Sequence, residues 1–151
     1  MGYYVHIEDS NCMLPHKHAN LAYWRMCDLN KNDDLKRGGS SNGDKWFAWM
    51  DPNYPETCKT AQDVLVELGF EVEEDDNGFV IHAYDNKSGQ EELFLEVISD
   101  LLRTVDNENS ALSKPFIVWR GEDDMVWKDL YGEKEVRSLQ GTITFQENAI
   151  G

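Results

Sequence analysis

Basic residues are scarce in this sequence. There are 14 Lys and Arg against 29 Asp and Glu, so the formal net charge is −15. An acidic excess of this size repels nucleic acid and anionic membranes, and it favours basic partners. No apolar run is long enough to span a bilayer, and the amino terminus has no basic stretch followed by an apolar one. We expect a soluble cytoplasmic protein that binds neither nucleic acid nor membranes directly.

Cysteine is also scarce. Cys12, Cys27 and Cys58 form no close pair, and an odd number without a close pair indicates reduced thiols rather than a disulfide framework. Cys12, His16 and His18 are of the ligand types that zinc prefers, but no fourth ligand follows at a spacing known for structural zinc sites. The sequence therefore predicts no bound metal and no cofactor.

A recognised catalytic motif is absent as well. Gly38 and Gly39 have neither the strand before them nor the Lys-Ser/Thr pair after them that a phosphate-binding loop needs. Cys58 lies near an expected helix start, where the dipole lowers a thiol pKa, but the sequence places no base such as His82 beside it. We therefore expect a protein that is not an enzyme. The alternative is a small metal-dependent hydrolase or nucleotide-processing enzyme that uses clustered carboxylates.

The clearest secondary structure lies in residues 70–102. Alternating apolar and polar residues predict a strand at 70–73, a turn at 75–78 and a second strand at 79–84. In residues 89–102 the apolar side chains form one stripe of a 3.6-residue period. This stripe predicts a helix with one buried face.

The other expected elements complete an α+β fold. Helices are expected at 17–29 and 57–68, the second closed by Gly69 in the left-handed conformation, and strands at 1–7, 116–119, 125–130 and between 136 and 145. Hairpins outnumber βαβ units, which favours an antiparallel sheet made of a hairpin, a C-terminal meander and an N-terminal strand, with about three helices packed on it. We expect residues 1–151 to form one domain with a flexible loop near 30–44.

The negative charge is concentrated in the middle third of the chain. Residues 51–100 hold 14 acids and 2 bases, whereas residues 1–50 hold 6 of each. Carboxylates repeat at i,i+4 on the expected helices and at i,i+2 on the expected strand, which spaces them about 6–7 Å apart. This spacing is close to the phosphate step of one nucleic-acid strand, so a rigid acidic face can occupy a basic nucleic-acid channel. A merely solvated acidic face is the simpler alternative.

Tryptophan offers a second kind of binding residue. Most of the five tryptophans are expected to pack in the core, and Leu21, Trp24 and Leu29 can share one face of the first helix. Trp46 and Trp49 lie beside the flexible loop, where a partly exposed ring can anchor a protein partner. The residues expected to bind a partner are therefore Asp63, Glu67, Glu71, Glu73, Glu92, Glu96, Asp100, Trp46 and Trp49. Glu92, Glu96 and Asp100 follow at i,i+4 steps on the third expected helix, with no basic partner at helical spacing among them.

Four stretches resemble a group of small acidic proteins from bacteriophages and related mobile elements. They are DLKRGG at 34–39, KWFAWM at 45–50, YDNKSGQEE at 84–92 and WRGED at 119–123. The group has no established catalytic residues, and the resemblance implies a phage protein acting in the cytoplasm of a bacterial host. In that setting small acidic proteins often inhibit defence nucleases or other DNA-binding machinery.

The sequence and the resemblance together give a functional hypothesis. We expect an acidic binding protein that meets a basic surface of a host nucleic-acid-binding or defence protein and inhibits it as a nucleic-acid mimic. The alternatives are the metal-dependent enzyme and a phage structural or assembly factor whose acidic face is only solvated. The sequence leaves the oligomeric state open.

Overall fold

The structure is a computed structural model and describes residues 3–35, 50–87, 91–105, 114–132 and 137–141. The strands are β1 (Tyr4–Ser10), β2 (Cys12–Pro15), β3 (Phe70–Glu74), β4 (Gly78–Lys87), β5 (Arg103–Thr104), β6 (Phe116–Gly121), β7 (Val126–Leu130) and β8 (Arg137–Gly141). The α-helices are α1 (His16–Asp28), α2 (Tyr54–Thr57), α3 (Ala61–Leu68) and α4 (Glu91–Val97), and 3-10 turns cover Leu29–Lys31, Asp33–Leu35 and Ser99–Leu101.

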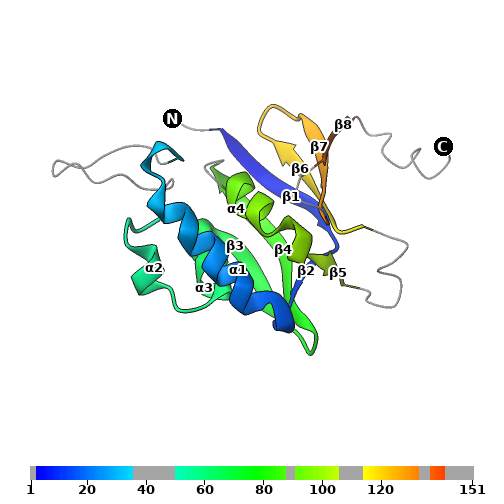
Figure 1. Cartoon of the computed structure of the whole chain (residues 1–151). Coiled ribbons are helices and arrows are strands. Elements are labelled where there is room, and N and C mark those ends of the chain that lie inside the picture. The colour runs from blue at the N-terminus through cyan, green and yellow to red at the C-terminus, as the bar shows by residue number, and fades with distance from the viewer. Residues whose placement is uncertain (1–2, 36–49, 88–90, 106–113, 133–136, 142–151) are drawn as a thin grey trace.

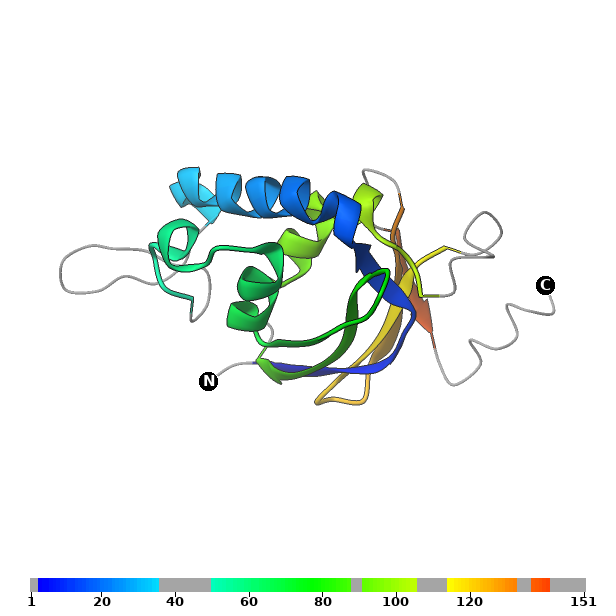
Figure 2. The same cartoon turned by 90° about the horizontal axis from the view of Figure 1, so that it is seen from below.

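The strands form one antiparallel sheet. Their order is β5-β2-β4-β1-β6-β7-β8, and β3 pairs with β4 as a side branch. The sheet is strongly curved, and α1, α3 and α4 lie on its concave side (Figures 1 and 2). The predicted α+β class with an antiparallel sheet is confirmed.

Strands β1 and β2 are nearly one strand, interrupted at Asn11. Both pair with β4 on one side, whereas on the other side β1 pairs with β6 and β2 with β5. Asn11 joins the two branches, because its Oδ1 accepts the N–H of Phe116 and its carbonyl accepts the N–H of Val105. A bulge between Ile7 and Asp9 adds local bending, as β-bulges do. The branch at Asn11 and this bulge together curve the sheet and give the concave face that receives the helices.

The core fills the space between the helices and this concave face. The helices and the sheet each contribute buried side chains, among them Ala22, Met26, Val64, Leu65, Phe94 and Leu95 from the helices and Phe70, Ile81, Tyr84, Ile117 and Trp119 from the strands. These residues belong to one hydrophobic cluster. The outward faces of the helices and of the sheet are therefore the surfaces available for binding.

The second predicted helix starts later than expected. The helix expected at 57–68 begins at Ala61, because Thr60 caps it by accepting the N–H of Asp63 through its side chain. Its end is confirmed, since Gly69 has a φ of 119° and its N–H donates to carbonyls of the last turn.

The third predicted helix is shorter than expected. The stripe at 89–102 predicted an unbroken helix, but α4 ends at Val97 and a 3-10 turn follows at Ser99–Leu101. Arg25 of α1 donates through Nη1 to the carbonyl of Val97 at 3.1 Å, which occupies an acceptor at the end of the helix. The apolar stripe continues across the break, so side-chain periodicity alone did not reveal it.

Two strands were missing from the prediction. Strand β2 is buried at all four positions because it pairs on both edges and is covered by the helices, so its sequence does not alternate. Strand β5 has only two residues, Arg103 and Thr104, and Thr104 pairs with Cys12 of β2. Of the loop predicted near 30–44, residues 36–44 lie outside the described residues.

Candidate functional site

The acidic residues of α3 have two different roles. Asp63 receives the N–H of Lys59 at 3.0 Å through Oδ2 while its own N–H donates to Thr60, so it stabilises the start of the helix. Glu67 lies one turn later and is exposed. Glu67 is therefore the residue of this pair whose carboxylate is available to a partner.

A pocket opens beside these carboxylates. It has a volume of about 570 Å³ and is lined by Asp51, Thr57, Cys58, Gln62, Asp63, Val66 and Glu67, a set that we call the α3 pocket. Three of these residues carry carboxylates and none is Lys or Arg. Burial, and then the negative charges of Glu67 and Asp63, raise the pKa of the Cys58 thiol, so the thiol is protonated at neutral pH. The pocket is anionic and suits a cationic group.

The acidic residues of β3 lie on another surface. Phe70 is buried in the core and Val72 is half-buried against it, so Glu71 and Glu73 point to the outer face of the sheet. His82 Nε2 of β4 lies 3.9 Å from the carboxylate of Glu71. The helices cover the opposite face of the sheet, so these two carboxylates are not continuous with the α3 pocket.

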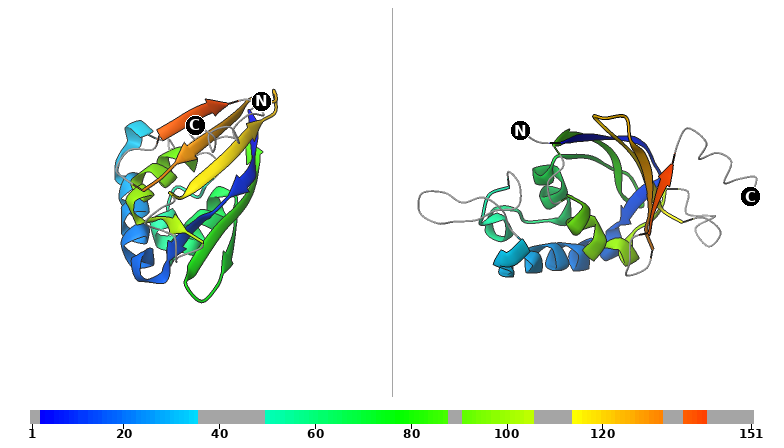
Figure 3. Two further views of the ribbon diagram at one scale, coloured as in Figure 1. Left: turned by 90° about the vertical axis from the view of Figure 1, so that its right-hand side faces the viewer. Right: turned by 90° about the horizontal axis from the view of Figure 1, so that it is seen from above.

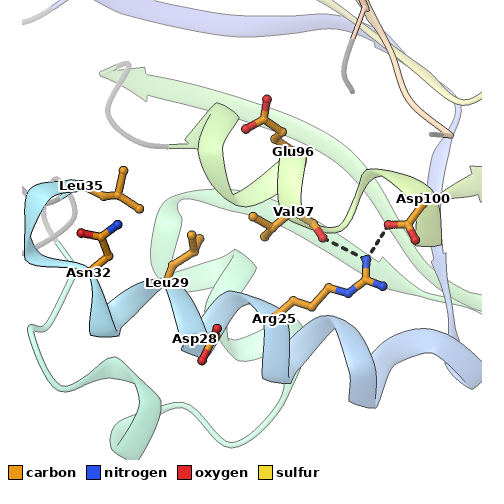
Figure 4. A pocket seen from close by; sticks show the side chains of 8 residues that line it. All are labelled: Arg25, Asp28, Leu29, Asn32, Leu35, Glu96, Val97 and Asp100. Atoms are coloured by element: carbon orange, nitrogen blue, oxygen red, sulfur yellow. Dashed lines mark hydrogen bonds and ion pairs between the residues drawn. The ribbon is translucent and has the colours of Figure 1, made fainter. Parts of the chain in front are cut away.

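The acidic row of Glu92, Glu96 and Asp100 has a basic partner that we did not predict. Arg25 of α1 forms an ion pair with Asp100 at 2.5 Å, and both side chains are about one third exposed (Figure 4). The expectation that this row lacks a basic partner was therefore wrong for Asp100. Glu92 and Glu96 are exposed, and desolvation followed by the charges of Glu91 and Glu96 raises the pKa of Glu92.

A second pocket lies between α1 and α4. Its volume is about 620 Å³, and Figure 4 shows its lining residues Arg25, Asp28, Leu29, Asn32, Leu35, Glu96, Val97 and Asp100. The carboxylate of Glu96 points away from Arg25 in this view. The ion pair to Asp100 balances part of the negative charge, and apolar side chains form another part of the wall. This pocket is less strongly anionic than the α3 pocket.

The tryptophans differ from expectation on α1. Trp119 is buried as expected, but Trp24 is 64% exposed and Leu21 is 47% exposed. The face that packs in the core is instead marked by Ala22 and Met26, both fully buried. Trp46 and Trp49, expected to anchor a partner, lie outside the described residues.

No match to a known protein was found. Comparisons with protein-family models, with curated proteins and with solved structures each gave none. Among the described residues, no helix is long and apolar enough to cross a bilayer, and no three His, Cys, Asp or Glu side chains are arranged to hold a metal ion. The geometry of the acidic pockets is therefore the main guide to function.

We expect folding stability to fall between pH 7.5 and 5.5 because of His18. Desolvation, and then the charges of Arg103 and Lys17, lower the pKa of His18 in the folded protein. The unfolded chain then binds more protons below its pKa of about 6.5, so the free energy of unfolding decreases as the pH is lowered through that value. Urea unfolding at the two pH values measures this change.

The variant His18→Gln is the control for this prediction, because glutamine is uncharged at both pH values. The decrease from pH 7.5 to 5.5 should be smaller in the variant than in the wild type. An equal decrease in both proteins would show that His18 does not cause it.

Proposed function

We propose that this protein binds a basic surface of another protein, and that the α3 pocket receives a lysine or arginine side chain from it. The observation that carries the proposal is the composition of the pocket, which has three carboxylates and no basic residue among its lining side chains. Carboxylates that line one concave site focus their combined field on that site. A cationic side chain therefore gains more there than at an isolated surface carboxylate.

The apolar part of the pocket supports the same type of ligand. Val66 is 52% exposed and lies at the lining of the pocket one residue before Glu67. Lysine and arginine carry aliphatic stems that pack on apolar surface while their charged ends reach a carboxylate. Glu67 and Asp51 are the charge partners that we assign to the incoming group, whereas Asp63 mainly holds the helix start.

The proposed partner is a nucleic-acid-binding or defence protein of a host cell, which this protein would inhibit by occupying its basic channel. The net charge of −15 and its concentration in residues 51–100 support this form of the proposal. Glu71 and Glu73 lie on the outer face of the sheet, whereas Glu67 lies on the helical side. One basic channel would therefore bind either the side with Glu67 or the side with Glu71 and Glu73, but not both at once.

Binding of a synthetic eight-lysine peptide tests the proposal. We expect Glu67→Lys to weaken the affinity by roughly 10-fold to 100-fold, because it replaces an attractive charge in the pocket by a repulsive one. Titration calorimetry measures the affinity, and nuclear magnetic resonance should place the largest peptide-induced shifts at the residues of the α3 pocket.

The matched control is Glu73→Lys, on the outer face of β3. Both variants change the net charge by the same amount, so they share any effect of overall charge on binding a polycation. We expect Glu73→Lys to weaken the affinity much less than Glu67→Lys. Equal losses, or peptide-induced shifts spread evenly over the molecule, would contradict the assignment of the α3 pocket.

The structure also restricts which acidic residues are suitable for charge reversal. Asp100→Lys would break the ion pair with Arg25 and place two positive charges together. Asp63→Lys would remove a cap of α3. Glu92 and Glu96 belong neither to this ion pair nor to this cap, so charge reversal at either of these exposed residues tests the contribution of α4 to binding.

A further inference from the structure

The outward side of α1 carries two exposed apolar side chains between two charges of opposite sign. Trp24 is the most exposed large hydrophobic residue in the part of the chain that the structure describes, and Leu21 lies beside it. Lys17 and Asp28 are exposed on the same side. Lys17, Leu21, Trp24 and Asp28, which we call the α1 ridge, follow at steps of four, three and four residues. These steps are the spacing of the contact positions in paired helices.

Helix α1, which carries the ridge, is fixed on its inner side by packing and hydrogen bonds. Ala22 and Met26 are buried in the core, and Tyr23 donates its hydroxyl to the carbonyls of Pro55 and Cys58. The ring of Tyr23 packs edge-on against that of Trp24, with the ring centroids 5.9 Å apart. In two perpendicular views α1 forms the outer boundary of the helical layer (Figures 2 and 3). A flat or helical partner can therefore approach it.

We propose that the α1 ridge binds the α1 ridge of a second copy of this chain, with the two helices antiparallel about a twofold axis. A twofold axis that passes between the two helices, at the level midway between Ala22 and Tyr23, places Leu21 opposite Trp24 of the second copy. The same axis places Lys17 opposite Asp28 of the second copy. Each contact then occurs twice, as in any interface between identical surfaces.

The self-complementary order of the four residues is what favours a second copy over an unrelated partner. One register satisfies the apolar pair and the charge pair together, and reversing the direction of one helix would place like charges near each other. Asp28 also lies 3.0 Å from Lys31 within its own chain, but its side chain is 69% exposed and can meet a second lysine. The two copies repel through their net charge, which salt of about 0.15 M screens beyond roughly 8 Å.

Formation of the dimer does not depend on the α3 pocket. It would strengthen the binding of a partner through that pocket. The pocket lies on the α2 and α3 side of α1, whereas the ridge faces away from the core. Two copies would present two anionic pockets on one particle. A partner with two basic sites would then be held more tightly than by one copy alone.

Sedimentation equilibrium at about 0.15 M salt, over protein concentrations from about 10 µM to about 1 mM, tests the proposal. We expect the mass of the wild type to rise with concentration from 17.4 kDa toward twice that value. Trp24→Ala should raise the dimer dissociation constant roughly a hundredfold, because a central aromatic contact is lost in both halves of the interface. Met125→Ala, which removes an exposed apolar side chain outside the ridge, should leave the constant unchanged.

Charge reversal distinguishes the effect of the ridge contacts on dimerisation from the effect of net charge. Lys17→Asp and Asp28→Lys change the net charge in opposite directions, yet each places like charges opposite one another and should weaken the dimer roughly tenfold. The double variant restores both pairs and the original net charge, and it should restore dimerisation. Circular dichroism of each variant checks that α1 stays folded.

Two results would overturn the proposal. One is a wild type that stays at 17.4 kDa over the whole concentration range, which would leave the ridge to another partner or to none. The other is a dimer whose stability follows net charge, with the two single reversals acting in opposite directions and the double variant giving no rescue.

Discussion

Replacing Phe94 by alanine is expected to lower the free energy of unfolding by about 3–5 kcal/mol. The side chain of Phe94 is fully buried, and its ring centroid lies 5.7 Å from that of Tyr54. Tyr54 in turn donates its hydroxyl to the carbonyl of Met26 in α1. Phe94 therefore joins three helices, α1, α2 and α4, and its removal leaves a cavity where they meet. A loss of this size is a large part of the stability of a typical domain.

Urea unfolding followed by circular dichroism measures this loss. The matched control is Glu92→Ala on the same helix, which removes an exposed side chain and should change the free energy of unfolding by less than about 0.5 kcal/mol. A loss below about 1 kcal/mol for Phe94→Ala would mean that the neighbouring side chains close the cavity. In that case α4 would not depend on this contact.

The second large effect is expected for Gly78→Ala. A Cβ at Gly78 would lie 2.3 Å from the carbonyl oxygen of Leu14 and 2.7 Å from the Cα of Pro15, so backbone atoms of β2 and β4 would have to separate. The N–H of His16, the first residue of α1, donates to the carbonyl of Asn77 beside this contact. We expect a loss of about 3 kcal/mol, the upper part of the range for overpacking, measured by the same urea unfolding.

Gly121→Ala is the comparison that isolates the backbone contribution. A Cβ at Gly121 would also be too close to its neighbour, but that neighbour is the side chain of Tyr3, which is 37% exposed and can rotate away. We therefore expect a much smaller loss than for Gly78→Ala. The hydrogen bond from Tyr3 to Asp123 raises the pKa of Tyr3 to about 12, and losing it should move that pKa back toward 10. Equal losses in the two variants would contradict the backbone explanation.

Local patterns in the sequence predicted the elements that have one face in the core and the other face in solvent. Strand β3 alternates because one of its faces meets the core and the other meets solvent. Helix α3 has a clear apolar stripe for the same reason, and Gly69 marks its end. The antiparallel sheet and the α+β class followed from these elements. The position of Glu71 and Glu73 on a solvent-facing surface was also predictable.

Contacts between distant segments were not predictable in the same way. The charge partner of Asp100 is Arg25, 75 residues earlier in the chain, so spacing along the helix predicted at 89–102 could not reveal it. The buried face of α1 was misassigned because the large apolar side chains of Leu21 and Trp24 indicated the wrong side, whereas Ala22 and Met26 are the residues that pack inward. Close packing of α1 on its neighbours favours the small Ala22 on the inner side.

The α3 pocket combines residues that no single pattern connects. Glu67 comes from a helix, Cys58 from the residue after α2, and Asp51 from the segment before α2. The sequence predicted Asp63 and Glu67 as binding residues on the basis of helical spacing. It gave no signal for Asp51, because its approach to α3 depends on how the chain turns between residues 51 and 60.

The branched pairing of β1 and β2 has a consequence for the order in which the chain can fold. Strand β1 is synthesised before both strands that it pairs with, β4 and β6, and Val5 lies opposite Gly121. At about 5–20 residues per second, synthesis needs on the order of ten seconds to produce β6 after β1 has been made. Pairing over such long separations also makes folding slow. The edge of β1 that pairs with β6 therefore stays unpaired for this time, and β1 is the segment whose protection by a chaperone would most improve the yield of folded protein.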